Sequence, residues 1–127
     1  ANRDSSQAMM DGLRYKLESK SFEAASQYHR TGQYKAATIA LENGMHDFPD
    51  SPYREQMEWL ILDSYYQYAI LSTERRKLER FNDAIEAFLT FAARFPDSSY
   101  RAEAERVQAR CIAEIEKLGS DTPAESP

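Results

Sequence analysis

Three kinds of residue in this chain have types that could do chemistry: one cysteine, two histidines and many carboxylates. Cys111 recurs at helical spacing on an apolar stripe, so we expect a buried structural thiol. The other members of that stripe are Ala104, Val107, Ile115 and Leu118. A nucleophilic thiol needs an activating base or cation within reach, and the sequence presents no dedicated one.

The histidines and carboxylates do not form a recognisable site either. His29 and His46 are too isolated for a metal site, and we expect surface or packing roles for both. The acidic residues follow exposed helix faces, as Glu103, Glu114 and Glu116 do, and no carboxylate pair is set apart by apolar surroundings. We therefore expect a protein that is not an enzyme and holds neither metal nor cofactor.

The segment at 53–73 is the first of two stretches that could bind a partner protein. Apolar residues cover a wide arc of the expected helix, including Trp59 and Tyr66. Packing is one interpretation, because the first helix of an inner repeat contacts several neighbours. The alternative is that Trp59 and Tyr66 line a groove for a partner peptide, a role that suits aromatic anchors.

The second stretch is a local basic patch in an acidic chain, formed by Arg75, Arg76, Lys77 and Arg80. A solvated helix end is one interpretation, since cations near a helix C-terminus complement its dipole. The other is a site for an acidic loop of a partner protein. The candidate partner-binding residues are Trp59, Tyr66, Arg75, Arg76 and Arg80.

Composition restricts the class of protein. At 127 residues the chain is long enough for one domain with a substantial core. Its net charge of −5 argues against a nucleic-acid-binding surface, which needs a basic excess. No run of residues approaches the roughly 18 apolar positions of a membrane-spanning helix.

Helical spacing of apolar residues dominates from about Ala8 to Leu118, and no stretch shows the alternation of a strand. The sequence thus predicts an all-α fold. The expected helices are at about 6–30, 34–46, 53–73, 81–94 and 100–118, within a repeat domain at 6–118. A tail or turn is expected at 1–5. Gly119 is expected to end the last helix, and residues 119–127 are expected to form a disordered polar tail.

A turn of the chain is written twice: "DFPDSPYRE" at 47–55 returns as "RFPDSSYRA" at 94–102. Pro49 disfavours a helical residue before it and cannot donate the next backbone bond, so it stops a helix. Ser51 is then a good N-cap, and Pro52 suits the first helical position. Arg54 and its repeat equivalent are expected to have a structural role.

Those two arginines, Arg54 and Arg101, recur with the turn. We expect them to reach back to Asp50 and Asp97, or to the end of the preceding helix. A shift of 47 residues (47 to 94) aligns further positions, such as Ala37 with Ala84. This indicates an internal repeat of two-helix units.

A fainter copy of the turn lies at 3–8, with Asp4, Ser5 and Ser6 in the places of Asp97 and its two successors. It predicts that the chain opens on a turn whose preceding helix is missing. We accordingly expect the chain to be the C-terminal part of a longer array. The apolar helix face exposed there would favour association.

The first unit resembles a tetratricopeptide repeat. Spaced residues before Pro49 match the family's Tyr, Gly, Tyr, Ala and large apolar positions: Tyr28, Gly32, Tyr34, Ala37 and Leu41. The resemblance implies a tetratricopeptide-like α-solenoid of about five helices.

A narrower resemblance is to the BamD family of outer-membrane assembly lipoproteins, in its Bacteroidetes-type form. It is carried by "GQYKAA", "DFPDSPYREQ", "ERFNDAIEAF" and "RFPDSSYRAEAE", within about residues 13–107. The family's lipidated cysteine has no counterpart here, since Cys111 lies mid-helix.

The BamD resemblance implies a helical scaffold, lipid-anchored on the periplasmic side of the outer membrane of Gram-negative bacteria. Its partners would be BamA-like periplasmic domains, other assembly lipoproteins and nascent outer-membrane proteins. The alternative is a generic tetratricopeptide adaptor or co-chaperone, periplasmic or cytoplasmic, that binds a peptide in its concave groove.

Overall fold

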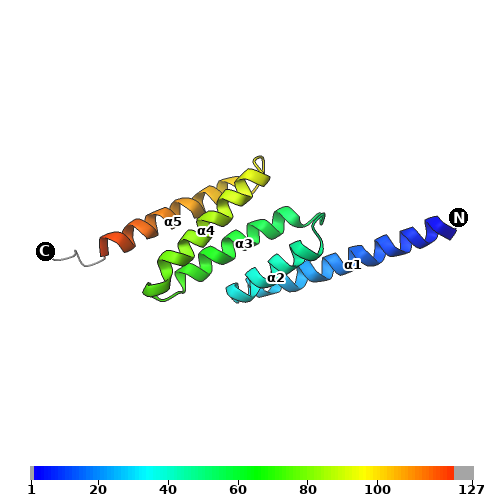
Figure 1. The fold of residues 1–127 in the computed structure, drawn as a ribbon, viewed down its shortest axis with the longest axis horizontal. Helices are drawn as coiled ribbons and strands as arrows, with labels where there is room; N and C mark the ends of the chain where they lie inside the picture. Colours follow the sequence, from blue (N-terminus) through cyan, green and yellow to red (C-terminus); the bar gives the residue numbers. More distant parts are fainter. Residues whose placement is uncertain (1, 122–127) are drawn as a thin grey trace.

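The computed structural model describes residues 2–121 of the chain, with side chains from residue 4 to 119. It contains no strand over that range, and its helices follow one another as antiparallel neighbours (Figure 1). They are α1 (Asn2–Arg30), α2 (Tyr34–Asp47), α3 (Arg54–Ile70), α4 (Glu74–Arg94) and α5 (Arg101–Asp121). The predicted all-α helical repeat of five helices is confirmed.

Helix α3 lies at the centre of the structure. It packs on α2 and α4 along its length and also contacts α1 and α5. Helices α2 and α4 lie on either side of it, and no residues of theirs approach within 8 Å, Cα to Cα, in the described chain (Figure 1). The first helices of successive units therefore form one row, α1, α3 and α5.

The core consists of two buried clusters, one on each side of α3. The cluster shared by α1, α2 and α3 contains Ala25, Ala37, Leu41, Met57 and Ile61. The larger cluster, shared by α3, α4 and α5, includes Leu62, Tyr66, Phe81, Phe88, Phe91 and Val107. Each two-helix unit buries its apolar face only against the next unit, as expected of a repeat.

The start of the chain differs from the expectation. Helix α1 already begins at Asn2, so the predicted tail or turn at 1–5 is wrong for residues 2–5, and Ala1 lies outside the described residues. Asp4, Ser5 and Ser6 are helical. The physical reason is that Arg3 stands where the turn copies have proline, so nothing interrupts the helix.

The connector between α3 and α4 also differs. Helix α3 ends at Ile70, and α4 begins at Glu74, so the basic stretch 74–80 forms its first two turns. Extended backbone at Thr73 starts this helix, and its carbonyl accepts the N–H of Arg76 at 2.9 Å. Helix α4 has 21 residues and α2 has 14, a difference of 7 or about two turns. Helix α4 is therefore the longer of the two second helices.

At the C-terminal end, α5 continues through Gly119 to Asp121, so the predicted end of the helix at Gly119 is wrong. The rest of the predicted tail, residues 122–127, lies outside the described residues. Gly32, which lies between the expected helices at 6–30 and 34–46, has φ +78, the left-handed conformation that favours glycine.

The two copies of the repeated turn have nearly the same backbone. Phe48 ends α2 with φ −131 and ψ 68, and Phe95 ends α4 with φ −129 and ψ 66. Ser51 Oγ accepts the N–H of Tyr53 at 3.1 Å, so the serine caps the turn. The helix itself begins at Arg54, which places Ser51 and Pro52 in the turn rather than at the N-cap and first helical position.

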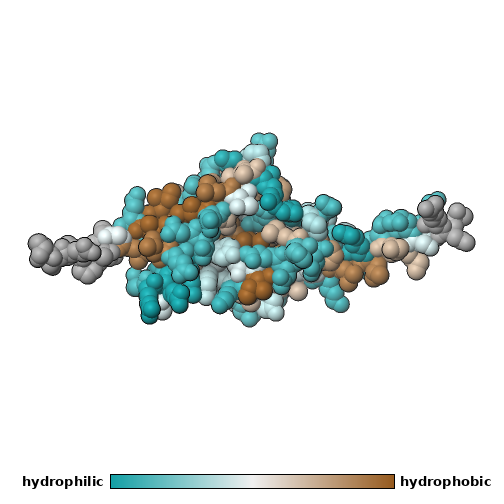
Figure 2. Space-filling view, in the orientation of Figure 1, coloured by the Kyte–Doolittle hydropathy of each residue, from teal (hydrophilic) through white to brown (hydrophobic). Residues whose placement is uncertain are grey.

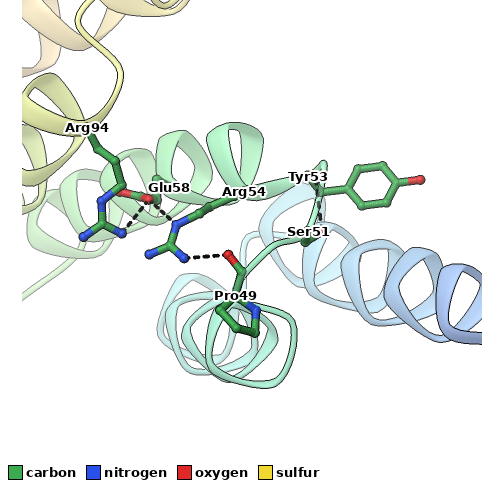
Figure 3. Close-up of polar contacts among 6 residues, drawn as sticks. All are labelled: Pro49, Ser51, Tyr53, Arg54, Glu58 and Arg94. Carbon is green, nitrogen blue, oxygen red and sulfur yellow. Dashed lines mark hydrogen bonds and ion pairs between the residues drawn. The ribbon is translucent and has the colours of Figure 1, made fainter. Parts of the chain in front are cut away.

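Arg54 closes the first turn from the helix side. Its guanidinium donates to the carbonyl of Pro49 at 2.8 Å and to the carboxylate of Glu58 at 3.0 Å (Figure 3). The arginine thus reaches back, as predicted, but it contacts the backbone carbonyl of Pro49 instead of the side chain of Asp50. A carbonyl of the turn after α2 thus gains a charged donor.

Arg101 repeats these contacts in the second turn. It donates to the carbonyl of Pro96 at 3.1 Å and to Glu105 at 2.9 Å. Asp97, the partner expected from the sequence, is not the one that it uses.

The two copies of the turn differ in how far the glutamate that binds the arginine is buried. The side chain of Glu58 is 5% exposed and that of Glu105 is 55% exposed. Glu58 also accepts a hydrogen bond from Arg94, at the end of α4, at 3.2 Å (Figure 3). Burial raises the pKa of Glu58, and Arg54 opposes the shift. This carboxylate therefore joins a turn of the first unit to the second unit.

Arg54→Ala should destabilise the protein by about 1–3 kcal/mol, because it leaves buried Glu58 with one fewer donor and frees the Pro49 carbonyl. The matched change Arg101→Ala should cost less than about 1 kcal/mol, since Glu105 remains hydrated. Urea unfolding followed by far-UV circular dichroism gives both values. Equal losses for the two variants would contradict the difference in burial as the cause.

Candidate protein-binding site

A groove of about 730 Å³ runs between α2 and α4, with α3 beneath it. It exists because these two helices pack on the same helix without contacting each other. We call it the α2–α4 groove. Its lining residues are Glu42, Met45, Ile61, Tyr65, Asp83, Glu86, Ala87, Leu89 and Thr90.

The floor of the α2–α4 groove is apolar. Ile61 belongs to the buried core, and Met45 and Tyr65 pack against the same cluster. Leu89, on the α4 wall, is 56% exposed. An exposed leucine next to a concave apolar surface provides area that a partner side chain can cover.

The walls of the groove are acidic. Glu42 comes from α2, and Asp83 and Glu86 come from α4. The hydroxyl of Tyr65, on α3, donates to Glu42 at 2.6 Å. Burial raises the pKa of Tyr65, and the three carboxylates raise it further. The phenol therefore lies in the negative field of both walls.

Asp83, on the α4 wall, lies close to other carboxylates. Partial burial raises the pKa of its carboxyl, and repulsion from Glu79 and Glu86 raises it further. Arg80 only partly opposes the shift. No lysine, arginine or histidine is among the lining residues of the groove in the described chain. The negative charge of the walls is thus incompletely neutralised.

The cysteine and the two histidines lie outside the α2–α4 groove. Cys111 is fully buried in the larger core cluster, as predicted, and burial followed by the charge of Glu114 raises the pKa of its thiol to about 12. His29 contacts Asp63 at 2.7 Å between α1 and α3, while His46 is exposed. Within residues 4–119, no three His, Cys, Asp or Glu side chains are grouped to hold a metal ion.

The two aromatic candidates for partner binding pack within the protein. Tyr66 is buried in the larger core cluster, near Phe81. Trp59 is half-buried and stacks on Tyr100, the residue just before α5, with ring centroids 5.6 Å apart. Neither lines the α2–α4 groove, so their positions favour the packing interpretation.

The three basic candidates divide into two kinds. Arg80 lies 4.3 Å from the ring centre of Tyr68 and donates to Ser72 at 2.7 Å, so it closes the loop between α3 and α4. Arg75 and Arg76 are exposed on the first turn of α4. The dipole explanation for this patch is wrong, since cations complement a helix C-terminus and these lie at an N-terminus.

A second apolar surface lies on the N-terminal half of α1. This part of the helix projects beyond the other helices, and Figure 2 shows brown, apolar atoms on it. Met10, Leu13 and Leu17 are exposed there and, with Arg14 and Phe48, line a smaller groove of about 400 Å³. The sequence predicted an apolar helix face at this end of the chain.

The acidic walls of the α2–α4 groove were not found from the sequence. Glu42, Asp83 and Glu86 belong to the many carboxylates that were interpreted as exposed helix faces. The only signal was that Asp83 and Glu86, three residues apart, lie beside the apolar positions of the same helix. Which two faces meet across the groove depends on tertiary packing.

Comparison with known proteins gives this chain no family. No protein-family model matches it, and no curated protein sequence matches it significantly. None of the helices in the described part of the chain is both long and apolar enough to cross a membrane. The function therefore has to be argued from the fold and from the surfaces described above.

Asp83→Asn should stabilise the protein at pH 7 by a few tenths to about 1 kcal/mol, because the neutral amide removes a repelled carboxylate. The sign follows from the raised pKa: ionising Asp83 costs more in the folded than in the unfolded state. This cost is absent below the ordinary pKa of about 3.9 and grows as the pH rises through the folded pKa. The gain should thus disappear at pH 3.

Urea midpoints at the two pH values measure this effect. Glu116→Gln, on an exposed position of α5, removes the same charge and serves as the control. An equal gain for both variants, or a gain for Asp83→Asn that persists at pH 3, would contradict a local repulsion at Asp83.

Proposed function

We propose that this protein is a non-catalytic protein-interaction scaffold of the BamD-like type. The observation that carries the proposal is the repeated turn, which has the same backbone and the same arginine contacts at Pro49 and Pro96. Two of the four stretches that resemble the BamD family are the two copies of this turn. Stacked units of this kind present extended surfaces that bind partner proteins.

Two surfaces of the described chain support a binding role. The α2–α4 groove combines an apolar floor with acidic walls, and the projecting half of α1 exposes Met10, Leu13 and Leu17. Exposed apolar surface of this kind marks protein-interaction sites in soluble domains. Cys111, whose thiol could have been a nucleophile, is buried in the core.

The BamD assignment supplies the proposed setting. The protein would act on the periplasmic side of the outer membrane, held there in its full-length form by a lipid anchor. It would bind BamA-like periplasmic domains, together with other assembly lipoproteins and nascent outer-membrane proteins. Arg75 and Arg76, exposed at the start of α4, are the proposed contacts for an acidic loop of such a partner.

A generic tetratricopeptide adaptor or co-chaperone, periplasmic or cytoplasmic, is the second candidate. The α2–α4 groove favours it, because a cleft of about 730 Å³ with an apolar floor can hold part of a peptide. The two candidates share the scaffold role and differ in the partner.

The assignment is tested by titrating the purified chain with soluble BamA-like periplasmic domains from a Bacteroidetes-type bacterium, using biolayer interferometry. We expect saturable binding. Charge reversal by Arg75→Glu with Arg76→Glu should weaken it at least tenfold, because the new glutamates would repel the acidic loop that the arginines attract.

The control is Lys16→Glu with Lys20→Glu, which makes the same change in net charge on exposed positions of α1. It should leave the affinity within about twofold. Absence of binding by the unsubstituted chain would contradict the BamD-like assignment. Equal weakening by both double variants would contradict the site at Arg75 and Arg76.

A further inference from the structure

We propose that the α2–α4 groove binds a short basic amphipathic segment of a partner protein, with apolar side chains on the floor and Lys or Arg on the walls. The proposal rests on the scaffold function proposed above, and it names the chemistry of the partner. It is independent of the BamD-like assignment and of the basic patch on α4.

The charges on the walls determine the sign of the partner. Glu42 on α2 faces Asp83 and Glu86 on α4 across the groove, and no basic side chain lines it in the described chain. Tyr65 gives Glu42 one hydrogen bond, which leaves most of the acceptor sites of these three carboxylates available to a partner. Because the carboxylates stand on both walls, a segment with basic residues on two sides would satisfy them together.

The floor determines the rest of the partner. Ile61, Met45 and Ala87 give it an apolar surface, and Leu89 stands exposed at the α4 edge. An apolar side chain placed there would remove Leu89 from water. Apolar anchors surrounded by polar contacts are the usual arrangement of a binding hot spot.

Other occupants fit the groove less well. No carboxylates are grouped for a metal ion within residues 4–119, so the charge is too dispersed for a single cation. A nucleic acid or an acidic segment would be repelled by the walls. A second copy of the chain is a competing occupant, because its own stretch 75–80 places exposed Leu78 among arginines. The experiment therefore includes it.

The probe is a fluorescein-labelled helical peptide in which two leucines one turn apart are flanked by four arginines. Fluorescence anisotropy should show saturable binding to the full chain that weakens as salt is raised. Two control peptides carry glutamate in place of arginine or serine in place of leucine. Both should bind at least tenfold more weakly, since each removes one half of the complementarity.

The matched protein variants locate the site. Glu42→Gln with Glu86→Gln removes one charge from each wall, and glutamine still accepts the hydrogen bond from Tyr65. It should weaken binding of the arginine peptide at least tenfold. Glu103→Gln with Glu116→Gln makes the same charge change on exposed positions of α5 and should have less than a twofold effect. Leu89→Ser should also weaken binding, and circular dichroism checks that each variant folds.

Three results would overturn the proposal: equal binding of the glutamate peptide, equal effects of the two glutamine pairs, or no binding of the arginine peptide. Sedimentation velocity tests the competing occupant. If the proposal holds, the unsubstituted chain should not associate with itself through the groove. Self-association that the double variant Glu42→Gln with Glu86→Gln abolishes would show that the groove binds a second copy of this chain, and would overturn the proposal of a different partner protein.

The outcomes of the two experiments are separable. Binding of BamA-like domains without binding of the arginine peptide would reject this inference and leave the assignment standing. The reverse result would reject the BamD-like assignment and retain the groove as a site for basic segments.

Discussion

The structure depends on the constraint that proline imposes at the ends of α2 and α4. Pro49 and Pro96 cannot donate a backbone hydrogen bond, so each helix stops at the phenylalanine before it. The arginine that begins the next helix, Arg54 or Arg101, then donates to the proline carbonyl. Each proline thus ends one helix and, through its carbonyl, holds the arginine that begins the next. This contact helps to set the direction in which α3 and α5 leave the turn.

The first of these turns also sets how the two units stack. Glu58, one turn into α3, receives Arg54 from its own turn and Arg94 from the end of α4. Because the carboxylate is buried, these two arginines supply the hydrogen bonds that it would otherwise receive from water. In the second turn Ser98 donates to Glu55 of α3 at 2.6 Å, so the turn before α5 is also held to α3 by a polar contact.

The same stacking produces the α2–α4 groove. Two second helices rest on one first helix, and the distance between them is set by the width of α3 and its side chains. The groove is therefore a product of repetition. A single helical hairpin would have no such feature, which connects the repeat in the sequence to the surface on which the proposed function rests.

Much of the fold was predictable because proline, glycine and apolar spacing act locally. Pro49, Gly32 and the stripe that contains Cys111 behave as the sequence indicates. The start of α4 was predicted wrongly, because the charged residues 74–80 were left between the expected helices at 53–73 and 81–94. Thr73 begins a helix there instead. The partners of Arg54 and the walls of the groove could not be predicted, since both depend on which faces meet after folding.

The burial of Cys111 has a practical consequence. Its side chain has no exposed surface and its thiol is protonated at neutral pH, so the native protein is shielded from alkylating reagents. Reaction requires α5 to separate from α4, at least transiently. The rate of alkylation therefore reports how often the last helix of the array opens, and the chain carries this probe without any substitution.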